Sequence, residues 1–166
     1  MCLALDALSL HCGSSCLLGD FGCGTGWVLA HALFAVAPRP VWGIDLAVAP
    51  LVPFLRALKR SGRPHLPVFY REGDIDSILS VDGLHVVFCF GAAFLESTLH
   101  HIVKLCSKTS SVHDIVWVAR DRRKQKYWIQ VLDDKGFTMT WERKCQMRKG
   151  KQWFWMFIAS RCLRYV

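Results

Sequence analysis

An aspartate and three alternate glycines stand together near the start of this chain, in the segment 20–26, D-F-G-C-G-T-G. A short apolar run precedes the aspartate, and a helix-like apolar run follows the last glycine. Glycine takes positive φ values and lets a ligand approach with no Cβ in the way. A turn that enters a helix also leaves free N–H groups at the helix N-terminus, where they hold ligands. The segment predicts a nucleotide-type cradle at the end of a first strand, and the alternative is a plain strand-to-helix connection.

Carboxylates also follow the next two apolar runs. Asp45 comes 25 residues after Asp20, where a doubly wound nucleotide-binding fold needs an acid for the ribose hydroxyls. The alternative for Asp45 is an N-cap of the next helix. After the third run, we expect Asp74 to accept a hydrogen bond from an adenine amino group and Ile75 to pack on the ring. Asp76 is the competing acid, or an N-cap for the residues that follow it.

The spacing of the glycines separates two classes of turn. A dinucleotide fingerprint places its third glycine three residues after the second, but here the interval is two. The form D-x-G-x-G-x-G resembles motif I of the class I S-adenosylmethionine-dependent methyltransferases, and the acid at position 45 is similar to their motif II. The resemblance implies that S-adenosylmethionine lies over the glycines, with Asp20 near its amino-acid end. Carried over position by position, it implies cofactor contacts from Asp20, Gly22, Cys23, Gly24, Thr25, Gly26, Asp45, Leu46, Asp74, Ile75, Cys89 and Phe90.

Apolar periodicity and turn residues predict the elements that position these groups. We expect parallel strands at 16–21, 41–45, 67–71, 84–90 and 113–119, helices at 26–36, 48–61, 94–107 and 122–133, and a hairpin of strands 137–146 and 152–161. This order predicts an α/β, Rossmann-like class I methyltransferase fold with a seven-stranded, mainly parallel sheet and a C-terminal antiparallel β-hairpin. At 166 residues, the chain is expected to be a single methyltransferase domain, 1–166, with a helical lead-in at 1–15.

The strand expected at 84–90 carries a second resemblance. The segment 87–94, V-F-C-F-G-A-A-F, is similar to histone lysine methyltransferases of the disruptor-of-telomeric-silencing type. This resemblance implies lysine N-methylation on chromatin, in the nucleus. That family keeps a lid element well upstream of motif I, but only 19 residues precede Asp20 here. The chain is then either a fragment or a member without part of that enclosure.

The resemblance also bears on the transfer site. Phe94 matches the family's phenylalanine, but the family's polar Asn or Asp falls on Phe90 or Gly91. Candidates for lining an apolar lysine channel are Phe90, Gly91, Phe94 and Trp117, with Trp153 as a further one, and ordinary core packing is the alternative for each aromatic. No side chain is assigned as a catalytic base. An RNA or small-molecule methyltransferase, or a non-catalytic domain that binds cofactor or nucleic acid, remain alternatives.

Basic residues gather in three clusters, and the formal net charge is +8. The clusters are Arg56, Lys59, Arg60 and Arg63; Arg120, Arg122, Arg123, Lys124 and Lys126; and Arg143, Lys144, Arg148, Lys149 and Lys151. Such clusters bind phosphate backbones, and solvated helix faces are the alternative. We therefore expect a histone, nucleosome or other nucleic-acid-containing substrate.

Composition narrows the location of the chain. Apolar residues make up 52%, yet no run reaches the roughly 18 apolar residues of a membrane span. The first residues lack the basic region of a signal peptide, so we expect an intracellular, nuclear protein without membrane contact. The eight cysteines are dispersed and are expected to be reduced thiols. The one metal-like cluster, 11–16, has no partner pair at zinc-finger spacing, so no metal is expected.

Overall fold

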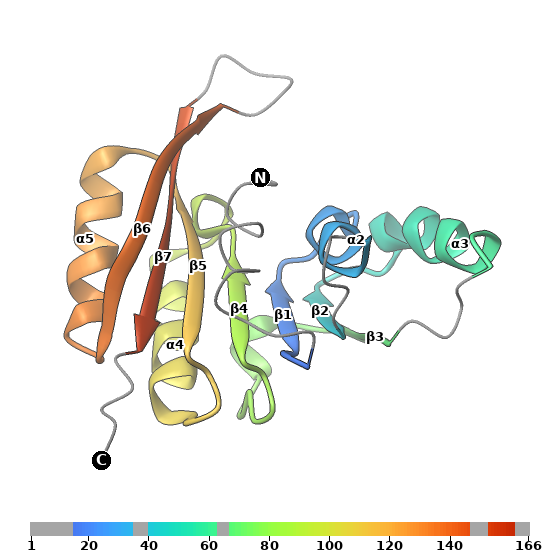
Figure 1. Ribbon diagram of the computed structural model, residues 1–166, viewed down its shortest axis with the longest axis horizontal. Coiled ribbons are helices and arrows are strands. Elements are labelled where there is room, and N and C mark those ends of the chain that lie inside the picture. Colours follow the sequence, from blue (N-terminus) through green and yellow to red (C-terminus); the bar gives the residue numbers. More distant parts are fainter. Residues whose placement is uncertain (1–14, 35–39, 63–66, 147–152, 162–166) are drawn as a thin grey trace. The chain divides into compact units, whose positions relative to one another are not determined.

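The computed structural model describes residues 15–34, 40–62, 67–146 and 153–161 (Figure 1). These residues fall into two compact units, 1–78 and 79–166, which we treat in turn. Nearly all of the expected helical lead-in at 1–15, and most of the metal-like cluster at 11–16, lie outside the described residues. So do four of the basic residues named above, Arg63, Arg148, Lys149 and Lys151.

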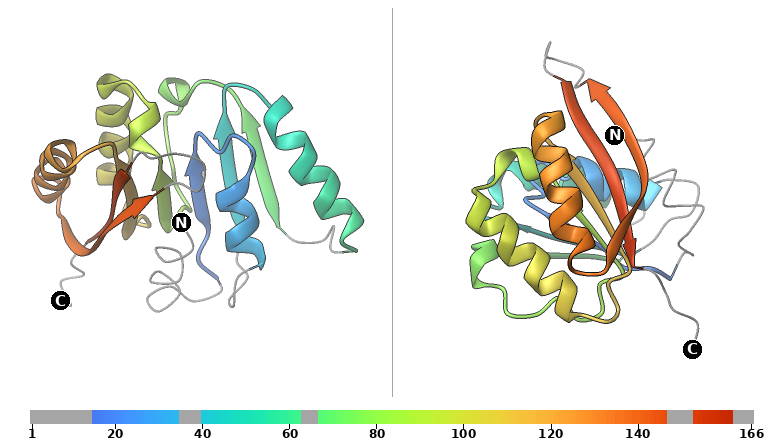
Figure 2. Two further views of the ribbon diagram at one scale, coloured as in Figure 1. Left: turned by 90° about the horizontal axis from the view of Figure 1, so that it is seen from above. Right: turned by 90° about the vertical axis from the view of Figure 1, so that its left-hand side faces the viewer.

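The first unit is a three-stranded parallel sheet with helices on one face (Figure 2). Its strands are β1 (Leu18–Phe21), β2 (Val41–Asp45) and β3 (Val68–Glu72), in the spatial order β3-β2-β1. Its helices are α2 (Trp27–Phe34) and α3 (Val52–Arg60), with short 3-10 turns η1 (Ala49–Leu51) and η2 (Ile75–Ser77). Each strand predicted here, and each of the helices predicted at 26–36 and 48–61, has its counterpart among the described residues. The carboxyl ends of all three strands therefore lie at one edge, which is where β1 meets the glycine turn.

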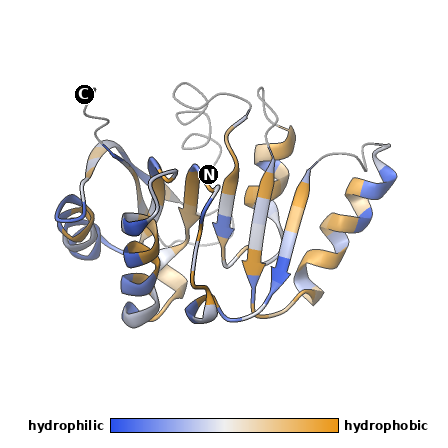
Figure 3. Cartoon of the chain, turned by 90° about the horizontal axis from the view of Figure 1, so that it is seen from below, coloured by the Kyte–Doolittle hydropathy of each residue, from blue (hydrophilic) through white to orange (hydrophobic). Residues whose placement is uncertain are grey.

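Helix α3 shows why this region folds as it does. Phe54 and Leu58, four residues apart, are buried, whereas Lys59 and Arg60 are exposed. In Figure 3, α3 is the helix at the right and carries both orange hydrophobic and blue hydrophilic segments. Pro50 and Pro53 do not break the structure, because each lies at the start of a helical turn, where no intrahelical N–H bond is lost. The amphipathic pattern thus holds α3 against the sheet.

The second unit has four strands in the order β4-β5-β7-β6. Strands β4 (Val86–Cys89) and β5 (Asp114–Ala119) are parallel, and every residue of both is buried, as predicted for a central strand with two covered faces. Strands β7 (Trp153–Arg161) and β6 (Phe137–Gln146) form the predicted antiparallel hairpin. Helices α4 (Glu96–Lys108) and α5 (Arg122–Asp133) lie on one face of this sheet (Figure 2).

Helix α4 begins later than the sequence predicts. Residues Gly91–Ala93 form a 3-10 turn, η3, and Leu95 is the extended residue just before the helix. The side chain of Leu95 is 75% exposed, because this residue precedes the first turn of the helix. Among the described residues, no helix is long and apolar enough to cross a membrane.

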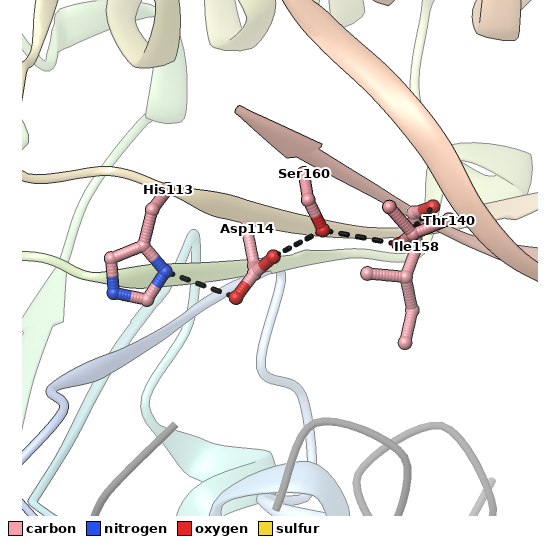
Figure 4. A network of polar contacts seen from close by, with 5 residues as sticks. All are labelled: His113, Asp114, Thr140, Ile158 and Ser160. Carbon is pink, nitrogen blue, oxygen red and sulfur yellow. Dashed lines mark hydrogen bonds and ion pairs between the residues drawn. The ribbon is translucent and has the colours of Figure 1, made fainter. Parts of the chain in front are cut away.

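A polar network ties β5 to the hairpin (Figure 4). The carboxylate of Asp114, which is 5% exposed, accepts a hydrogen bond from Ser160 Oγ at 2.5 Å and lies 3.0 Å from His113 Nδ1. Thr140 Oγ1 lies 3.0 Å from the same serine oxygen. A buried carboxylate is costly unless it is paired. The network therefore favours the one register in which Asp114 and Ser160 are opposite each other.

The end of β7 fixes the end of α4. Arg161 donates hydrogen bonds to the carbonyl oxygens of Thr109, Cys106 and Ser107, at 3.1, 3.0 and 3.3 Å. Its guanidinium also lies 4.7 Å from the ring centroid of Phe137. A helix leaves its last carbonyls without intrahelical partners and carries partial negative charge there. Arg161 thus satisfies the C-terminus of α4 with a cation.

Candidate functional site

The glycine turn between β1 and α2 requires glycine at each of its three positions. Gly22, Gly24 and Gly26 have φ values of 77°, 49° and 76°, a region that other residues rarely adopt. Gly26 is also crowded, since a Cβ there would lie 2.7 Å from Leu51 Cδ1 and 2.9 Å from Phe54 Cδ1. The third glycine therefore lets η1 and α3 pack against the turn.

The N–H groups of this turn are not free. Those of Gly22 and Cys23 donate to the carbonyl oxygen of Ile44, at 2.8 and 3.1 Å. The N–H of Gly24 donates to Asp45 Oδ2 at 2.8 Å, and that of Gly26 donates to Cys23 O at 2.8 Å. These four N–H groups are therefore used within the protein, by β2 and by the turn itself. The free N–H groups expected at the N-terminus of α2, which begins at Trp27, stay a prediction.

Asp20 lies at the end of β1, beneath the turn, and is 2% exposed. Burial, and secondarily the negative charge of Asp45, raise the pKa of its carboxyl group from 3.8 to about 8. The same causes, with Asp20 as a neighbour, raise the pKa of the Cys23 thiol to about 12. The site therefore lacks positive charge, and a bound cation would stabilise the ionised form of Asp20.

Asp45, at the end of β2, connects the strand to the turn. Besides accepting from Gly24, its carboxylate accepts from the N–H of Ala47 at 3.4 Å. It is not the N-cap of the next helix, which was the alternative interpretation, since Val48 precedes η1 and Leu51 precedes α3. Glu72 pairs with Asp45 in the β2–β3 register and accepts a hydrogen bond from the N–H of Val48 at 3.2 Å. Sequence analysis missed Glu72, whose position at the last residue of β3 was the available signal.

Tyr70 is a second residue that sequence analysis missed. It lies opposite Gly43 in the β2–β3 register, and its hydroxyl is buried with no hydrogen-bond partner among the described residues. Burial raises the pKa of this hydroxyl, as do the charges of Glu72, Cys23 and Asp45. Tyr70 thus places an unused hydroxyl beside the acids of the site.

The remaining predicted contacts of the first unit lie beyond β2 and β3. Leu46 follows Asp45 and is 71% exposed. Asp74, not Asp76, caps the 3-10 turn η2, because its Oδ1 accepts from the N–H of Asp76 at 2.9 Å. Ile75, in that turn, is 5% exposed. The first unit thus brings Asp20, the glycines and Asp45 together, with Leu46 and Asp74 at the ends of the neighbouring strands.

The predicted residues of the second unit gather at the end of β4. Cys89 is fully buried, and the ring centroid of Phe90 lies 5.3 Å from that of Phe154. A Cβ at Gly91 would lie 2.7 Å from Trp117 Nε1 and 3.2 Å from Val118 O. The indole of Trp117 therefore fills the space that a side chain at position 91 would need.

Two further aromatic candidates for the channel belong to β5 and β7. Trp117 is fully buried and packs on Trp128 with ring centroids 4.9 Å apart, so it belongs to the core behind Gly91. Its Nε1 is buried and has no hydrogen-bond partner among the described residues. Trp153 lies on β7 and is 48% exposed to solvent. Neither side chain is part of the lining of the cavity described next, and their role in a lysine channel stays a prediction.

A cavity of about 350 Å³ does lie within the second unit, between η3 and the first turns of α4 and α5. Its lining includes Gly91, Phe94, Arg120 and Trp128. Its three other charged neighbours are Glu96, Asp121 and Lys124, and two of them pair: Lys124 Nζ lies 2.7 Å from Glu96 Oε2, and this bond lowers the pKa of the glutamate. Phe94 thus lines a cavity that has an aromatic surface and charged groups of both signs, and its role in a substrate channel stays a prediction.

Comparison with solved structures defines the fold. The chain is similar to magnesium protoporphyrin IX methyltransferase from Synechocystis, with 19% identity, a TM-score of 0.72, and 96% of this chain and 79% of that chain covered. The methyltransferase domain of bacterial CtHen1-C has 12% identity and a TM-score of 0.76, with 96% of this chain and 95% of that chain covered. The tRNA methyltransferase TrmK of B. subtilis has 11% identity and a TM-score of 0.70, with 95% of this chain and 64% of that chain covered. No protein-family model and no curated protein sequence matches the chain. The chain has the Rossmann-like fold of the class I methyltransferases, as its sequence predicted.

Proposed function

We propose that this protein binds S-adenosylmethionine at the glycine turn and transfers its methyl group to RNA. The observation that carries the first half is the glycine turn beside two acids, of which Asp20 is buried and Asp45 is half-buried. Four N–H groups of the turn are already bonded to Ile44 O, Asp45 and Cys23 O, whereas Asp20 and Asp45 suit a ligand with an ammonium group and hydroxyls. S-adenosylmethionine has such groups and no phosphate. Magnesium protoporphyrin IX methyltransferase, which has the same fold, was solved with this cofactor bound.

The residues present fit this cofactor in charge and in space. Gly22 and Gly24 present backbone without a Cβ, Asp20 holds a proton that an incoming ammonium group would displace, and the carboxylate of Asp45 is positioned for hydroxyl donors. Asp74 and Tyr70 supply an acceptor and a free hydroxyl at the next strand. When bound, the cofactor supplies an activated methyl group. The protein's part is chiefly alignment of the acceptor, because the displacement needs two groups held in line.

We propose RNA as the acceptor because of the charge on the second unit. Arg120, Arg123, Lys126, Arg143 and Lys144 are exposed or line the cavity, and a small apolar substrate needs none of them. TrmK of B. subtilis, which shares the fold, is by its name a tRNA methyltransferase.

Lysine N-methylation on chromatin is the second candidate, and one observation favours it. Phe94 and Trp128 line the cavity, and an apolar wall disfavours the ammonium form of lysine and so lowers its pKa. This matters because only about one lysine in a thousand is neutral at pH 7 when its pKa is near 10.4. The similarity of 87–94 to histone lysine methyltransferases supports the same candidate. It would place the protein in the nucleus.

Radiolabelled methyl transfer tests both candidates. The full chain is incubated with labelled S-adenosylmethionine and total RNA, nucleosomes, free histones or a porphyrin. We expect label in RNA, and none with an Asp45→Ala variant, because that change removes the acceptor for the hydroxyl groups and the support of Gly24. Label in histones alone would select the second candidate. Absence of binding heat with both S-adenosylmethionine and its demethylated product would reject the cofactor itself.

A further inference from the structure

A row of aromatic side chains on β7 emerges from beneath α5. Residues 153, 155 and 157 point to one face of the hairpin, because side chains alternate along a strand. Phe157 is fully buried, Trp155 is half-buried and Trp153 is 48% exposed. In Figure 1 the hairpin continues past the first turn of α5, so this end of the row is uncovered by the helix. Large exposed aromatics in a row are characteristic of a binding surface.

Trp155 and Trp153 each have a cation over the ring. The guanidinium of Arg122, from the first turn of α5, lies 4.3 Å from the centroid of Trp155. The ammonium of Lys144, from β6, lies 4.9 Å from the centroid of Trp153. Glu142 holds Arg122 at 2.7 Å, but none of the ion pairs among the described residues includes Lys144. A net positive charge therefore stays beside the rings.

We propose that Trp153, Trp155, Arg122 and Lys144 form a binding surface for single-stranded nucleic acid. Unpaired bases stack on aromatic side chains whatever their sequence, and neighbouring cations neutralise the phosphates that link them. Bases would stack on the ring faces of the two tryptophans that Arg122 and Lys144 now cover, and these two long side chains would swing aside to the phosphates. A duplex keeps its bases stacked on one another and offers none to these rings. An acidic protein surface would use the cations alone and leave the tryptophans without a role.

This surface narrows the RNA substrate of the proposed function to unpaired segments, but binding here does not require methyl transfer. The test therefore measures binding without cofactor. Fluorescence anisotropy with the full chain compares a labelled oligouridine of about 12 nucleotides, the usual size for such sites, with a duplex RNA and with labelled polyglutamate. We expect the single strand to bind tighter than either competitor. Equal or tighter binding of the duplex or of polyglutamate would overturn the proposal.

Variants separate stacking from charge. We expect Trp153→Leu and Trp155→Leu each to weaken binding to the single strand on the order of tenfold, and Trp153→Phe to retain most of it because stacking persists. Lys144→Gln should reduce the slope of log K against log salt by about 0.7, the value for one phosphate of a single strand. Phe69→Leu, an equally exposed aromatic on β3, and Lys59→Gln, on α3, are the matched controls.

The outcomes distinguish this proposal from the enzymatic one. Leucine variants that melt like the parent but bind the oligouridine unchanged would refute the surface. If a leucine variant fails to fold, the Trp153→Phe and Lys144→Gln variants still test the surface. A Lys144→Gln variant with the affinity and the salt slope of the wild type would refute the role of the cation. Tight oligouridine binding without methyl transfer would keep the surface and reject the proposed reaction.

Discussion

Cofactor binding should depend on pH through Asp20. The carboxyl group of Asp20 has a pKa of about 8 in the folded chain, because it is buried and Asp45 is nearby. If the ammonium group of the cofactor binds to the ionised form, the proton must leave first. Each pH unit below 8 then costs close to tenfold in affinity, and we expect Kd to fall about ninefold from pH 6 to pH 7. The affinity should stop rising near pH 8 and fall at higher pH, since the α-amine of the cofactor itself has a pKa of about 8 and loses its charge there.

The same shift has a signature in the free protein. The folded pKa of Asp20 lies above its unfolded value of 3.8, so the stability that its protonated form contributes is complete below pH 3.8. As the pH rises above 3.8, this contribution to the free energy of unfolding falls by up to about 1.4 kcal/mol per pH unit, and it is lost above pH 8. Asp20→Asn, which cannot ionise, should therefore flatten the fall in unfolding free energy between pH 4 and pH 8. Asp82→Asn, which changes an exposed carboxylate in the second unit, should leave the pH dependence of the unfolding free energy unchanged.

Isothermal titration calorimetry checks the linkage directly. Titration of S-adenosylhomocysteine at pH 6.5, in two buffers of different ionisation enthalpy, should report release of about one proton per cofactor bound. Methylthioadenosine, which lacks the amino-acid part, should bind without proton release. A Kd that does not change between pH 6 and pH 7, or an equal slope in Asp20→Asn, would refute the role assigned to this carboxyl group.

Three further changes test the packing. Gly26→Ala should lower the free energy of unfolding by about 2 kcal/mol or more and weaken cofactor binding, because the new Cβ meets buried side chains at a positive φ. Gly62→Ala also has a positive φ but open space around it, and should lower the free energy of unfolding by about 1 kcal/mol. Equal losses in urea unfolding would contradict this difference. Gly91→Asn should destabilise the chain, because the new side chain clashes with the indole of Trp117. Adding Trp117→Leu to this variant should recover part of the lost stability. If the losses of the two single variants simply add in the double variant, the clash is refuted. Arg161→Leu should cost about 2 kcal/mol in thermal unfolding, since two carbonyls of α4 and that of Thr109, just after it, lose a charged donor. A smaller loss than for the same change at an exposed arginine of α5 would contradict this role.

The sequence predicted the order of strands and helices because that order is recorded in local patterns. Apolar runs of strand length alternate with amphipathic runs, as in α3, and each element buries the face that its periodicity predicts. The positive φ values of Gly22, Gly24 and Gly26 could also be predicted, since alternate glycines between a strand and a helix have few other uses. Leu95 shows the limit of such patterns, because the start of a helix decides whether its first apolar residue is covered.

Contacts between distant residues could not be predicted in the same way. The hydrogen bond from Gly24 to Asp45 spans 21 residues, and it decides that the turn offers a carboxylate rather than an N–H group to a ligand. The bond from Ser160 to Asp114 spans 46 residues and sets the register of the hairpin. Neither leaves a periodic signal in the sequence, because each depends on which strands become neighbours.

Gly91 and Trp117 connect this limit to the chemistry of the site. In the sequence, Gly91 is one of the two positions where the similar family has a polar Asn or Asp near the methyl-transfer site. The sequence alone therefore indicates that a polar group that could orient the acceptor is lost. The structure gives the position a different meaning, since the indole of Trp117 occupies the space and no carboxamide could fit without moving it. The acceptor must then be aligned by the cavity that Phe94 and Trp128 line, and by whatever holds the rest of the substrate. A protein that aligns its acceptor in this way depends on binding at a distance, so loss of the Trp153 and Trp155 surface should lower turnover at low substrate concentration more than at saturation.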